Sequence, residues 1–420
     1  MQRKEVLLSR ILKSKKEREP LEIIIETENN RKTKEKAANQ LRKLGKITHV
    51  FKTIPYIGII CTGKDAEQIA NKIYRKDVSR IFEKSFRNTL TVMKSVDLSN
   101  KFSIIPTGKN SKAYFRPKEN LWNLENIGAY KAHKSSTGSG AKIAIIDTGV
   151  DYTHPELSSN FTRKKGHDFI NDDDNPMDKN GHGTHVAGTT AGKNCGVAPD
   201  ATLYAVRVLD ENGSGSDMTV AAGIEWAMLN NIDIAGMSLG GPTASKALED
   251  ICRLASQNNV LLVAAAGNNG YGPNYPAAFG DYVIAVAAVD KENEHASFSN
   301  IWETNDISAP GVNIYSCYPG GQYRVFSGTS MSQPHISGAL GLVVPKTRNP
   351  NLAEETMYET AKRLESSEPY DNNWIFGAGL VRADNMLNNA YHNGKIDKIL
   401  KRKYNNTLKN VGKIAWKIIW

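Results

Sequence analysis

The chain has 420 residues, with 54 Lys and Arg, 44 Asp and Glu, and four Cys. This length exceeds a compact domain of about 100–200 residues, so we expect two or more domains. No run of about 18 apolar residues occurs, which argues against a membrane-spanning helix. The cysteines are widely spaced and form no CxxC pair, which argues against a zinc framework and a dense disulfide scaffold.

Charge is distributed in three blocks. Residues 1–120 have a net charge of +15, residues 121–391 of −12, and residues 392–420 of +7. A basic chain often binds nucleic acid, but here the opposite charges lie within one molecule, so no nucleic acid is expected as a partner. The basic residues 1–120 and the acidic residues 121–391 would attract each other, which favours docking of the first segment on the second. The alternative is that each block is a solvated surface.

The first elements predict a small domain. Residues 21–27 form an apolar run typical of a buried strand, and the order that follows is helix, strand, strand, helix, strand. This order is the α+β ferredoxin-like motif, which we place at residues 21–84 after a basic segment at 1–20. The two helices are expected at 32–44 and 64–74. Two strands are expected around a turn at Pro55, and the last strand is expected at 78–82. Residues 85–120 lack periodicity and are predicted to be a linker, with LTVM and FSII as short strands.

Residues 121–391 alternate apolar strands with helical segments. Continuous apolar strands are typical of a parallel sheet buried on both faces, so the predicted fold class is α/β with a doubly wound sheet. In such sheets the functional residues gather at the carboxyl ends of the strands. The expected strands are 141–147, 203–209, 232–239, 260–268 and 282–290. The expected helices are 216–230, 243–258, 330–344 and 353–364.

The C-terminal segment 392–420 is basic. Lys409, Lys413 and Lys417 recur every four residues with Ile and Trp between them. This spacing predicts a basic amphipathic helix that contacts a membrane surface or a partner. The alternatives are a short helix docked on the body or a frayed tail.

Three segments contain the parts of a nucleophilic triad. Asp147 ends a predicted strand, His182 lies in NGHGTHVAG, and Ser330 lies in SGTSMSQPHISG before a predicted helix. Serine becomes a good nucleophile only when an imidazole accepts its proton, and a carboxylate fixes the tautomer of that imidazole. A serine at a helix start also places its own N–H close to a developing oxyanion. Each residue alone has a structural alternative as a turn, core or N-cap residue, but the three segments together are far more specific.

The three segments resemble those of the subtilisin-like serine proteases, the subtilase family, in sequence and in the chain order Asp, His, Ser. The resemblance covers about residues 121–391 and implies a serine endopeptidase that acts through an acyl-enzyme on Ser330. It implies that Asp147 orients His182, the general base, and that Asn268 in VLLVAAAGNNG is the oxyanion donor. The substrates would be proteins or peptides.

The resemblance also implies how a peptide substrate binds. NGSGSD and AGMSLGG are similar to two edge segments that pair with an extended peptide, a mode that recognises mainly backbone. The implied substrate-binding residues are Ser214, Gly215, Ser238, Leu239, Gly240, Ala265, Gly267 and Asn274. Asn274 stands where the family closes its primary specificity pocket, and the absence of an acid there favours broad specificity. The sequence departs from the family pattern at two places. Gly236 stands where Asn is usual, and Ser332-Gln333 replaces a common pair of small residues.

A structural calcium ion is also implied. The segment HDFINDDDNPMDKNGHG is similar to a calcium loop of thermitase-like enzymes, and carboxylate oxygens suit calcium. The implied ligands are Asp168, Asn171, Asp173 and Asn175, and Asp306 resembles the carboxylate of a second, weaker site. Glu156 stands at the position of a calcium ligand in the family. The loop at 189–199, however, is shorter than in relatives that have a strong calcium site. The alternative is a solvated acidic loop.

The N-terminal domain, with KLGKITHVFKTIPYIGII, resembles a subtilase propeptide. The resemblance implies an intramolecular inhibitor and folding aid that is removed by self-processing within residues 85–120. We expect a monomer. An inhibitory propeptide suggests an extracellular or cell-envelope protein, whereas the lack of a visible signal peptide suggests a cytoplasmic one, and both stay open.

Two other functions fit parts of the sequence. The segment from Gly236 to Gly240 matches the G-x-S-x-G elbow of α/β-hydrolases, with Ser238 as nucleophile and Asp306 and His335 as partners. This hypothesis leaves the three triad segments unexplained. If the N-terminal domain stayed docked on the protease domain permanently, the protein would instead be a non-catalytic binding protein with a protease fold. The HGTH segment lacks the glutamate and the spacing of an HExxH zinc motif.

Overall fold

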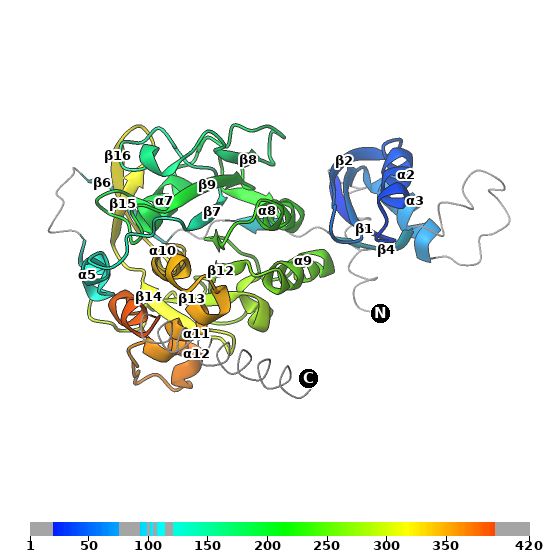
Figure 1. Cartoon of the computed structure of the whole chain (residues 1–420). Coiled ribbons are helices and arrows are strands. Elements are labelled where there is room, and N and C mark those ends of the chain that lie inside the picture. The colour runs from blue at the N-terminus through cyan, green and yellow to red at the C-terminus, as the bar shows by residue number, and fades with distance from the viewer. Residues whose placement is uncertain (1–19, 75–92, 99–100, 104–106, 114–120, 391–420) are drawn as a thin grey trace, which may run out of the picture.

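The structure is a computed structural model that describes residues 20–74, 93–98, 101–103, 107–113 and 121–390. A small N-terminal domain, mostly blue in Figure 1, lies beside a larger domain whose colours run from cyan through green and yellow to orange-red. None of the helices in these ranges is long and apolar enough to cross a membrane. The C-terminal helix predicted within 392–420 and nearly all of the basic segment at 1–20 lie outside the described residues.

The N-terminal domain has the predicted β-α-β-β-α-β order. Its sheet has the strand order β2-β3-β1-β4, and neighbouring strands run antiparallel. The elements are β1 (Leu21–Thr27), α2 (Arg31–Leu41), β2 (Gly45–Val50), β3 (Tyr56–Cys61), α3 (Gly63–Tyr74) and β4 (Met93–Leu98). Strand β4 pairs with β1 and lies in the segment predicted to be a linker, so the domain extends beyond residue 84. The strand expected at 78–82 falls outside the described residues.

The larger domain contains the predicted doubly wound sheet. Seven strands pair in the order β14-β13-β12-β11-β7-β9-β8, and every pair is parallel. They are β7 (Lys142–Asp147), β8 (Gly166–Asp168), β9 (Thr202–Arg207), β11 (Ile234–Met237), β12 (Leu261–Ala265), β13 (Ile284–Val289) and β14 (Ile307–Pro310). Five of these strands were predicted from the sequence. Strands β8 and β14 were not predicted, because three or four residues form no recognisable apolar run.

Helices cover both faces of this sheet. They are α5 (Trp122–Asn126), α6 (Ala129–Ala132), α7 (His182–Ala191), α8 (Asp217–Leu229), α9 (Lys246–Gln257), α10 (Thr329–Thr347), α11 (Pro350–Thr360) and α12 (Asn372–Phe376). In β7, Ile143 and Ile145 pack with α7 and α10, whereas Ala144 and Ile146 pack with α8 and α9. Successive side chains of a strand point to opposite faces, which explains the continuous apolar run. The four predicted helices correspond to α8, α9, α10 and α11.

Strand β1 of the N-terminal domain is also covered on both faces. Ile23 and Ile25 lie in the core of their own domain, together with Leu41 of α2. Ile24 points the other way and packs in the same cluster as Met218 of α8. The N-terminal domain therefore docks on the α8 and α9 face of the larger domain.

The segment predicted to be a linker contains strands that join the two domains. Strand β5 (Lys101–Ser103) pairs antiparallel with β10 (Ser214–Ser216). Strand β6 (Thr107–Ala113) pairs antiparallel with β16 (Gln322–Ser327), which pairs in turn with β15 (Ile314–Tyr318). The short strand predicted at FSII overlaps β5, whereas no strand was predicted at β6. Strand pairing uses backbone N–H and C=O groups, so the polar sequence of β6 gave no periodic apolar signal.

Candidate active site

The three predicted catalytic residues are brought together from separate elements. Asp147 is the last residue of β7, His182 is the first residue of α7, and Ser330 is the second residue of α10. His182 Nδ1 lies 2.8 Å from Asp147 Oδ1, so the carboxylate can hold the imidazole in one tautomer and orientation. All three side chains are buried. The carboxyl end of β7 thus carries the acid of a triad, as expected for an α/β sheet.

A buried carboxylate that was not predicted from the sequence connects the two catalytic segments. Asp178 Oδ1 accepts hydrogen bonds from the Gly181 N–H and the Thr148 hydroxyl, each at 2.9 Å. Gly181 directly precedes the catalytic histidine, and Thr148 directly follows the catalytic aspartate. Burial raises the pKa of Asp178, and its hydrogen bonds oppose that rise. The available signal was an Asp shortly before a helix start, where carboxylates commonly accept backbone N–H groups.

The Ser330 hydroxyl is not hydrogen-bonded to its predicted base in this structure. Its hydroxyl donates to the Ser238 carbonyl at 3.1 Å, while His182 Nε2 is buried and has no hydrogen-bond partner among the described residues. Proton transfer therefore requires the hydroxyl to turn from Ser238 to His182. The neighbouring His185 is no alternative base, because burial and the charge of His182 lower its pKa to about 3.

Asn268 lies beside the start of α10, where the oxyanion site was predicted. Asn268 Oδ1 accepts the N–H and the hydroxyl of Thr329, each at 2.9 Å. The Thr329 hydroxyl oxygen also accepts the Gly267 N–H at 3.1 Å. These bonds fix the Asn268 carboxamide next to the nucleophile. The first N–H groups of a helix have no carbonyl partner within the helix, so the Ser330 N–H can stabilise a developing negative charge.

The predicted substrate edges already hold a strand of this chain. Strand β5 pairs with β10 on one side, and on the other side Ser103 and Gly240 exchange two backbone hydrogen bonds of 3.2 Å. The backbone of Ser214, Gly215 and Gly240, which was predicted to bind substrate, makes these contacts. The chain itself therefore occupies part of the groove predicted for a peptide substrate.

The other predicted substrate-binding residues supply backbone or shape. The Leu239 side chain is buried in the core beside α8 and α9. Asn274 is buried, and its Nδ2 donates to the Ala265 carbonyl at 2.8 Å. Gly267 has a φ of +111°, and a Cβ there would lie 2.9 Å from Asn274 Cβ, so a side chain would collide with Asn274. These positions present no ionised side chain to the substrate.

The two departures from the family pattern compensate each other. A Cβ on Gly236 would lie 2.6 Å from Gln333 Nε2 and 2.9 Å from the Ser337 hydroxyl oxygen. Gln333 Nε2 donates to that Ser337 oxygen at 2.6 Å, and Gln333 Oε1 accepts the Ser238 hydroxyl at 2.9 Å. The glutamine side chain therefore fills the space left by the missing side chain at Gly236 and supports the strand end next to the nucleophile.

Restoring the usual residue at only one of these positions should be destabilising. Gly236→Asn forces a collision, and Gln333→Ser leaves a cavity and removes a buried hydrogen bond. Each should lower the free energy of unfolding by about 1–3 kcal/mol, and the double variant should lose at least about 1 kcal/mol less than the sum. Denaturant unfolding in a Ser330→Ala background measures all three. Strictly additive losses would show that the two positions do not compensate.

Ser238 is not placed as a nucleophile. Its hydroxyl lies 2.7 Å from the Ser330 carbonyl oxygen and 2.9 Å from Gln333 Oε1, and neither group is a base. His335, the proposed partner, has its Nε2 2.7 Å from Asn123 Nδ2, and burial lowers its pKa to about 4. The nucleophile-elbow hypothesis is therefore not supported.

The predicted calcium ligand Asp168 is engaged by a cationic side chain of the protein itself. Arg207 Nη1 donates to Asp168 Oδ2 at 2.7 Å, both side chains are buried, and Asn171 Nδ2 donates to the same oxygen at 2.9 Å. Asp173 and Asn175 are exposed, and Asp173 Oδ1 accepts the Asn175 N–H. Within the described ranges, no three His, Cys, Asp or Glu side chains are grouped to hold a metal ion. These residues do not fit a calcium ion bound through Asp168, because the guanidinium already neutralises it.

Comparison with known proteins agrees with the family resemblance of the three triad segments. The sequence profile of the Subtilase family matches residues 138–394. Subtilisin Savinase of Lederbergia lenta is 43% identical over 270 residues, which are 63% of this chain and 97% of that protein. Subtilisin E of Bacillus subtilis (strain 168) is 42% identical over 273 residues, which are 62% of this chain and 69% of that protein. The thermostable alkaline protease of Halalkalibacterium halodurans is 45% identical over 273 residues, with 62% and 72% covered. The chain belongs to the subtilase family.

The subtilase is a serine endopeptidase, as predicted. From this geometry we expect His182 to accept the Ser330 proton as Ser330 attacks the peptide carbonyl, and Asp147 to stabilise the imidazolium that forms. We expect Asn268 and the Ser330 N–H to stabilise the oxyanion of the tetrahedral intermediate. His182 should then protonate the leaving amine, and water should hydrolyse the acyl-enzyme by the reverse sequence of proton transfers.

Proposed function

We propose that this subtilase is made as a zymogen whose N-terminal domain inhibits it until self-processing removes that domain. The supporting observation is that β5 lies between β10 and the segment at Gly240 and pairs with both. A peptide substrate needs the same backbone edges, so a substrate and β5 cannot bind together. The family match begins at residue 138, so the role of the preceding residues rests on these contacts.

Docking of the N-terminal domain is centred on a buried glutamate of α8. Glu225 Oε1 accepts the Thr53 N–H at 2.7 Å and the Thr53 hydroxyl at 2.5 Å, and Glu225 Oε2 lies 3.3 Å from His49 Nε2. Burial would raise the pKa of Glu225, but the hydrogen bonds from His49 and Thr53 outweigh it and lower the pKa. Phe51 and Ile54 pack in the same core cluster as α8.

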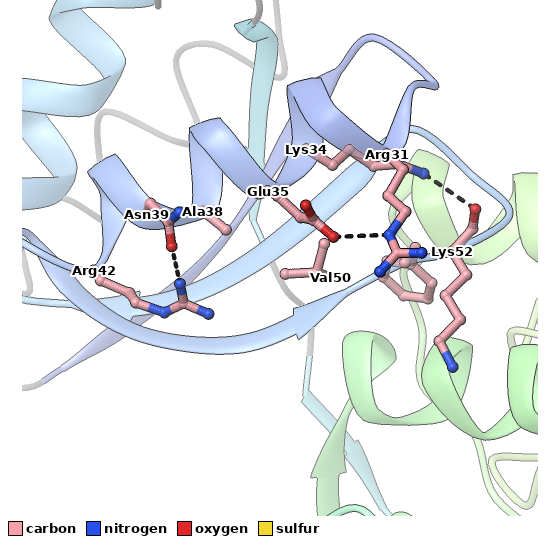
Figure 2. Close-up of a pocket in the computed structure, with 9 residues that line it drawn as sticks. Arg31, Lys34, Glu35, Ala38, Asn39, Arg42, Val50 and Lys52 are labelled. Carbon is pink, nitrogen blue, oxygen red and sulfur yellow. Dashed lines mark hydrogen bonds and ion pairs between the residues drawn. The ribbon is translucent and has the colours of Figure 1, made fainter.

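A buried lysine supports the loop that contacts Glu225. Figure 2 shows Lys34 of α2 extended toward the Lys52 carbonyl, beside a cavity of about 800 Å³. Lys34 Nζ donates to the Lys52 and Ile54 carbonyls at 3.3 and 3.1 Å, on either side of Thr53. Burial lowers the pKa of Lys34, and the charge of Glu225 opposes this. The ammonium group therefore holds the loop in the shape that presents Thr53 to Glu225.

Removing the Glu225 carboxylate should loosen docking. In a full-length Ser330→Ala background, Glu225→Ala leaves the Thr53 N–H without its acceptor, which costs about 1–3 kcal/mol and corresponds to roughly 5- to 150-fold more undocked domain. Trypsin should then remove the N-terminal domain about tenfold faster, as followed by gel and mass spectrometry. Glu355→Ala, an exposed position on α11, is the matched control and should leave the rate unchanged. Equal rates for both variants would show that Glu225 does not hold the domain.

We also propose Asp306, rather than the acidic loop, as the ligand of a structural calcium ion. Asp306 borders a cavity of about 510 Å³ that is also lined by Glu303 and Glu354. Its Oδ2 accepts the Ala285 N–H at 2.8 Å, so the other oxygen can face a cation. Burial, with Glu354 and Asp281 nearby, raises the pKa of Asp306 to about 7, and a cation would stabilise the ionised form. Backbone carbonyls and water would supply the remaining ligands.

Calcium should therefore stabilise the protein through Asp306. In a Ser330→Ala background, calcium at about ten times its Kd should raise Tm by a few degrees over the same chain in EDTA. The added Asp306→Asn substitution should abolish that shift, whereas Asp168→Asn should retain it. Loss of the shift in Asp168→Asn alone would place the ion in the acidic loop instead.

A further inference from the structure

Two thiols of the larger domain lie in contact. Cys195 Sγ and Cys317 Sγ are 3.7 Å apart, 122 residues apart in sequence, and both side chains are buried. Cys195 follows α7, and Cys317 lies in β15. We propose that Cys195 and Cys317 form a disulfide bond when the chain folds in the presence of a small-molecule disulfide.

The surroundings leave room for the two sulfur atoms. A Cβ on Gly188 would lie 2.7 Å from Cys317 Sγ, and a Cβ on Gly192 would lie 2.5 Å from Cys195 Sγ. Glycines at the end of α7 thus provide the space that the sulfurs occupy. A disulfide needs an S–S distance of about 2.05 Å, so the sulfurs must approach each other by less than about 2 Å.

The remaining two cysteines cannot compete for this pairing. Cys61 is buried in the core of the N-terminal domain, and Cys252 of α9 is buried on the opposite face of the parallel sheet. Cys195 and Cys317 share the core that contains α7 and α10. Cys252 is therefore a matched control, since it is an equally buried thiol with no cysteine neighbour.

The folded protein keeps these thiols unreactive. Glu156, whose Oε2 accepts the Asn194 N–H at 2.6 Å, lies 3.9 Å from Cys195 Sγ. Burial, the contact with Cys195 and the charge of Glu156 raise the pKa of Cys317, and thiol exchange requires a thiolate. The bond should therefore form while the site is still open during folding, and burial should then protect it from reductants. The two thiols lose two protons and two electrons, which convert one molecule of oxidised glutathione into two of glutathione.

The bond would hold both ends of the helix that carries the catalytic base. Strand β15 already contacts the start of α7, because the Tyr318 hydroxyl donates to the Asn180 carbonyl at 3.1 Å and its ring packs against Gly181. A bond from Cys317 to Cys195 would tie the same strand to the segment after the helix end. A cross-link that closes a loop of this length restricts the unfolded chain strongly.

The test uses the full-length Ser330→Ala chain, which lacks the nucleophile. The reduced, unfolded chain is refolded with oxidised and reduced glutathione, alkylated, and mapped by mass spectrometry without reduction. We expect a mass about 2 Da lower before alkylation and one cross-linked peptide pair containing Cys195 and Cys317. The oxidised chain should melt on the order of 10 °C above the chain refolded in dithiothreitol. Both effects should vanish in Cys195→Ala and Cys317→Ala and persist in Cys252→Ala.

Two results would overturn the proposal. One is a refolded chain in which all four cysteines are alkylated in the presence of oxidised glutathione. The other is a cross-link that includes Cys61 or Cys252. The map of the chain with all four cysteines decides between these outcomes even if an alanine variant fails to fold.

Discussion

Ser330→Ala is expected to lower kcat by a factor of about 10⁶, the loss found when subtilisin itself loses its nucleophile. The hydroxyl is the atom that forms the acyl-enzyme, and without it only the oxyanion groups and substrate binding contribute to catalysis. Hydrolysis of a chromogenic peptide measures the effect after trypsin has removed the N-terminal domain from both the wild type and the variant. KM should change little, because the substrate is held mainly by the backbone of β10 and Gly240.

Ser238→Ala is the matched control for this substitution. Ser238 is equally buried, and its hydroxyl contacts the Ser330 carbonyl and Gln333 without touching a base. Its loss should therefore lower kcat by much less, within about tenfold, through small shifts of the nucleophile segment. A Ser238→Ala enzyme as inactive as Ser330→Ala would revive the nucleophile-elbow mechanism.

Asp147→Asn is expected to lower kcat by a factor of about 10⁴. Asp147 Oδ1 accepts from His182 Nδ1 and from the Thr148 N–H, so the carboxylate holds the proton on Nδ1 and leaves Nε2 to act as the base. An asparagine amide group can donate to Nδ1 and select the opposite tautomer, in which Nε2 already carries a proton. Initial rates at saturating substrate measure the loss.

Asp151→Asn makes the same chemical change in a nearby loop. Asp151 is buried, but its oxygens accept from Thr153 and from the Gly320 N–H rather than from the histidine. Its variant should lose stability and retain kcat within about tenfold. Equal losses of kcat in the two variants would mean that Asp147 acts through local packing and not through the tautomer of His182.

The sequence was sufficient for features that local pattern determines. Apolar runs such as 141–147 predicted buried parallel strands, because side chains on both faces of β7 must be apolar. The triad was predictable because each member lies in a segment with its own glycines and flanking residues. The small N-terminal domain was predictable from its order of elements, although β4, which completes its sheet, lies in the segment predicted to be a linker.

Features that depend on partners distant in sequence were not predictable. Nothing in the acidic loop shows that Arg207, 39 residues later, reaches Asp168 and neutralises it. Gly236 and Gln333 were noted as separate departures, and only the fold shows that one fills the space of the other. Strand β6 is polar and has no periodicity, because it is held by backbone pairing with β16.

The most direct test is a time course of intact mass for the full-length wild type and for Ser330→Ala, with terminal sequencing of each new fragment. If the chain is a self-processing subtilase zymogen, the wild type should lose an N-terminal fragment that ends within residues 85–120, while Ser330→Ala stays whole. Cleavage of both proteins at the same rate would assign processing to another protease. A wild type that stays whole and hydrolyses no peptide would contradict the zymogen proposal.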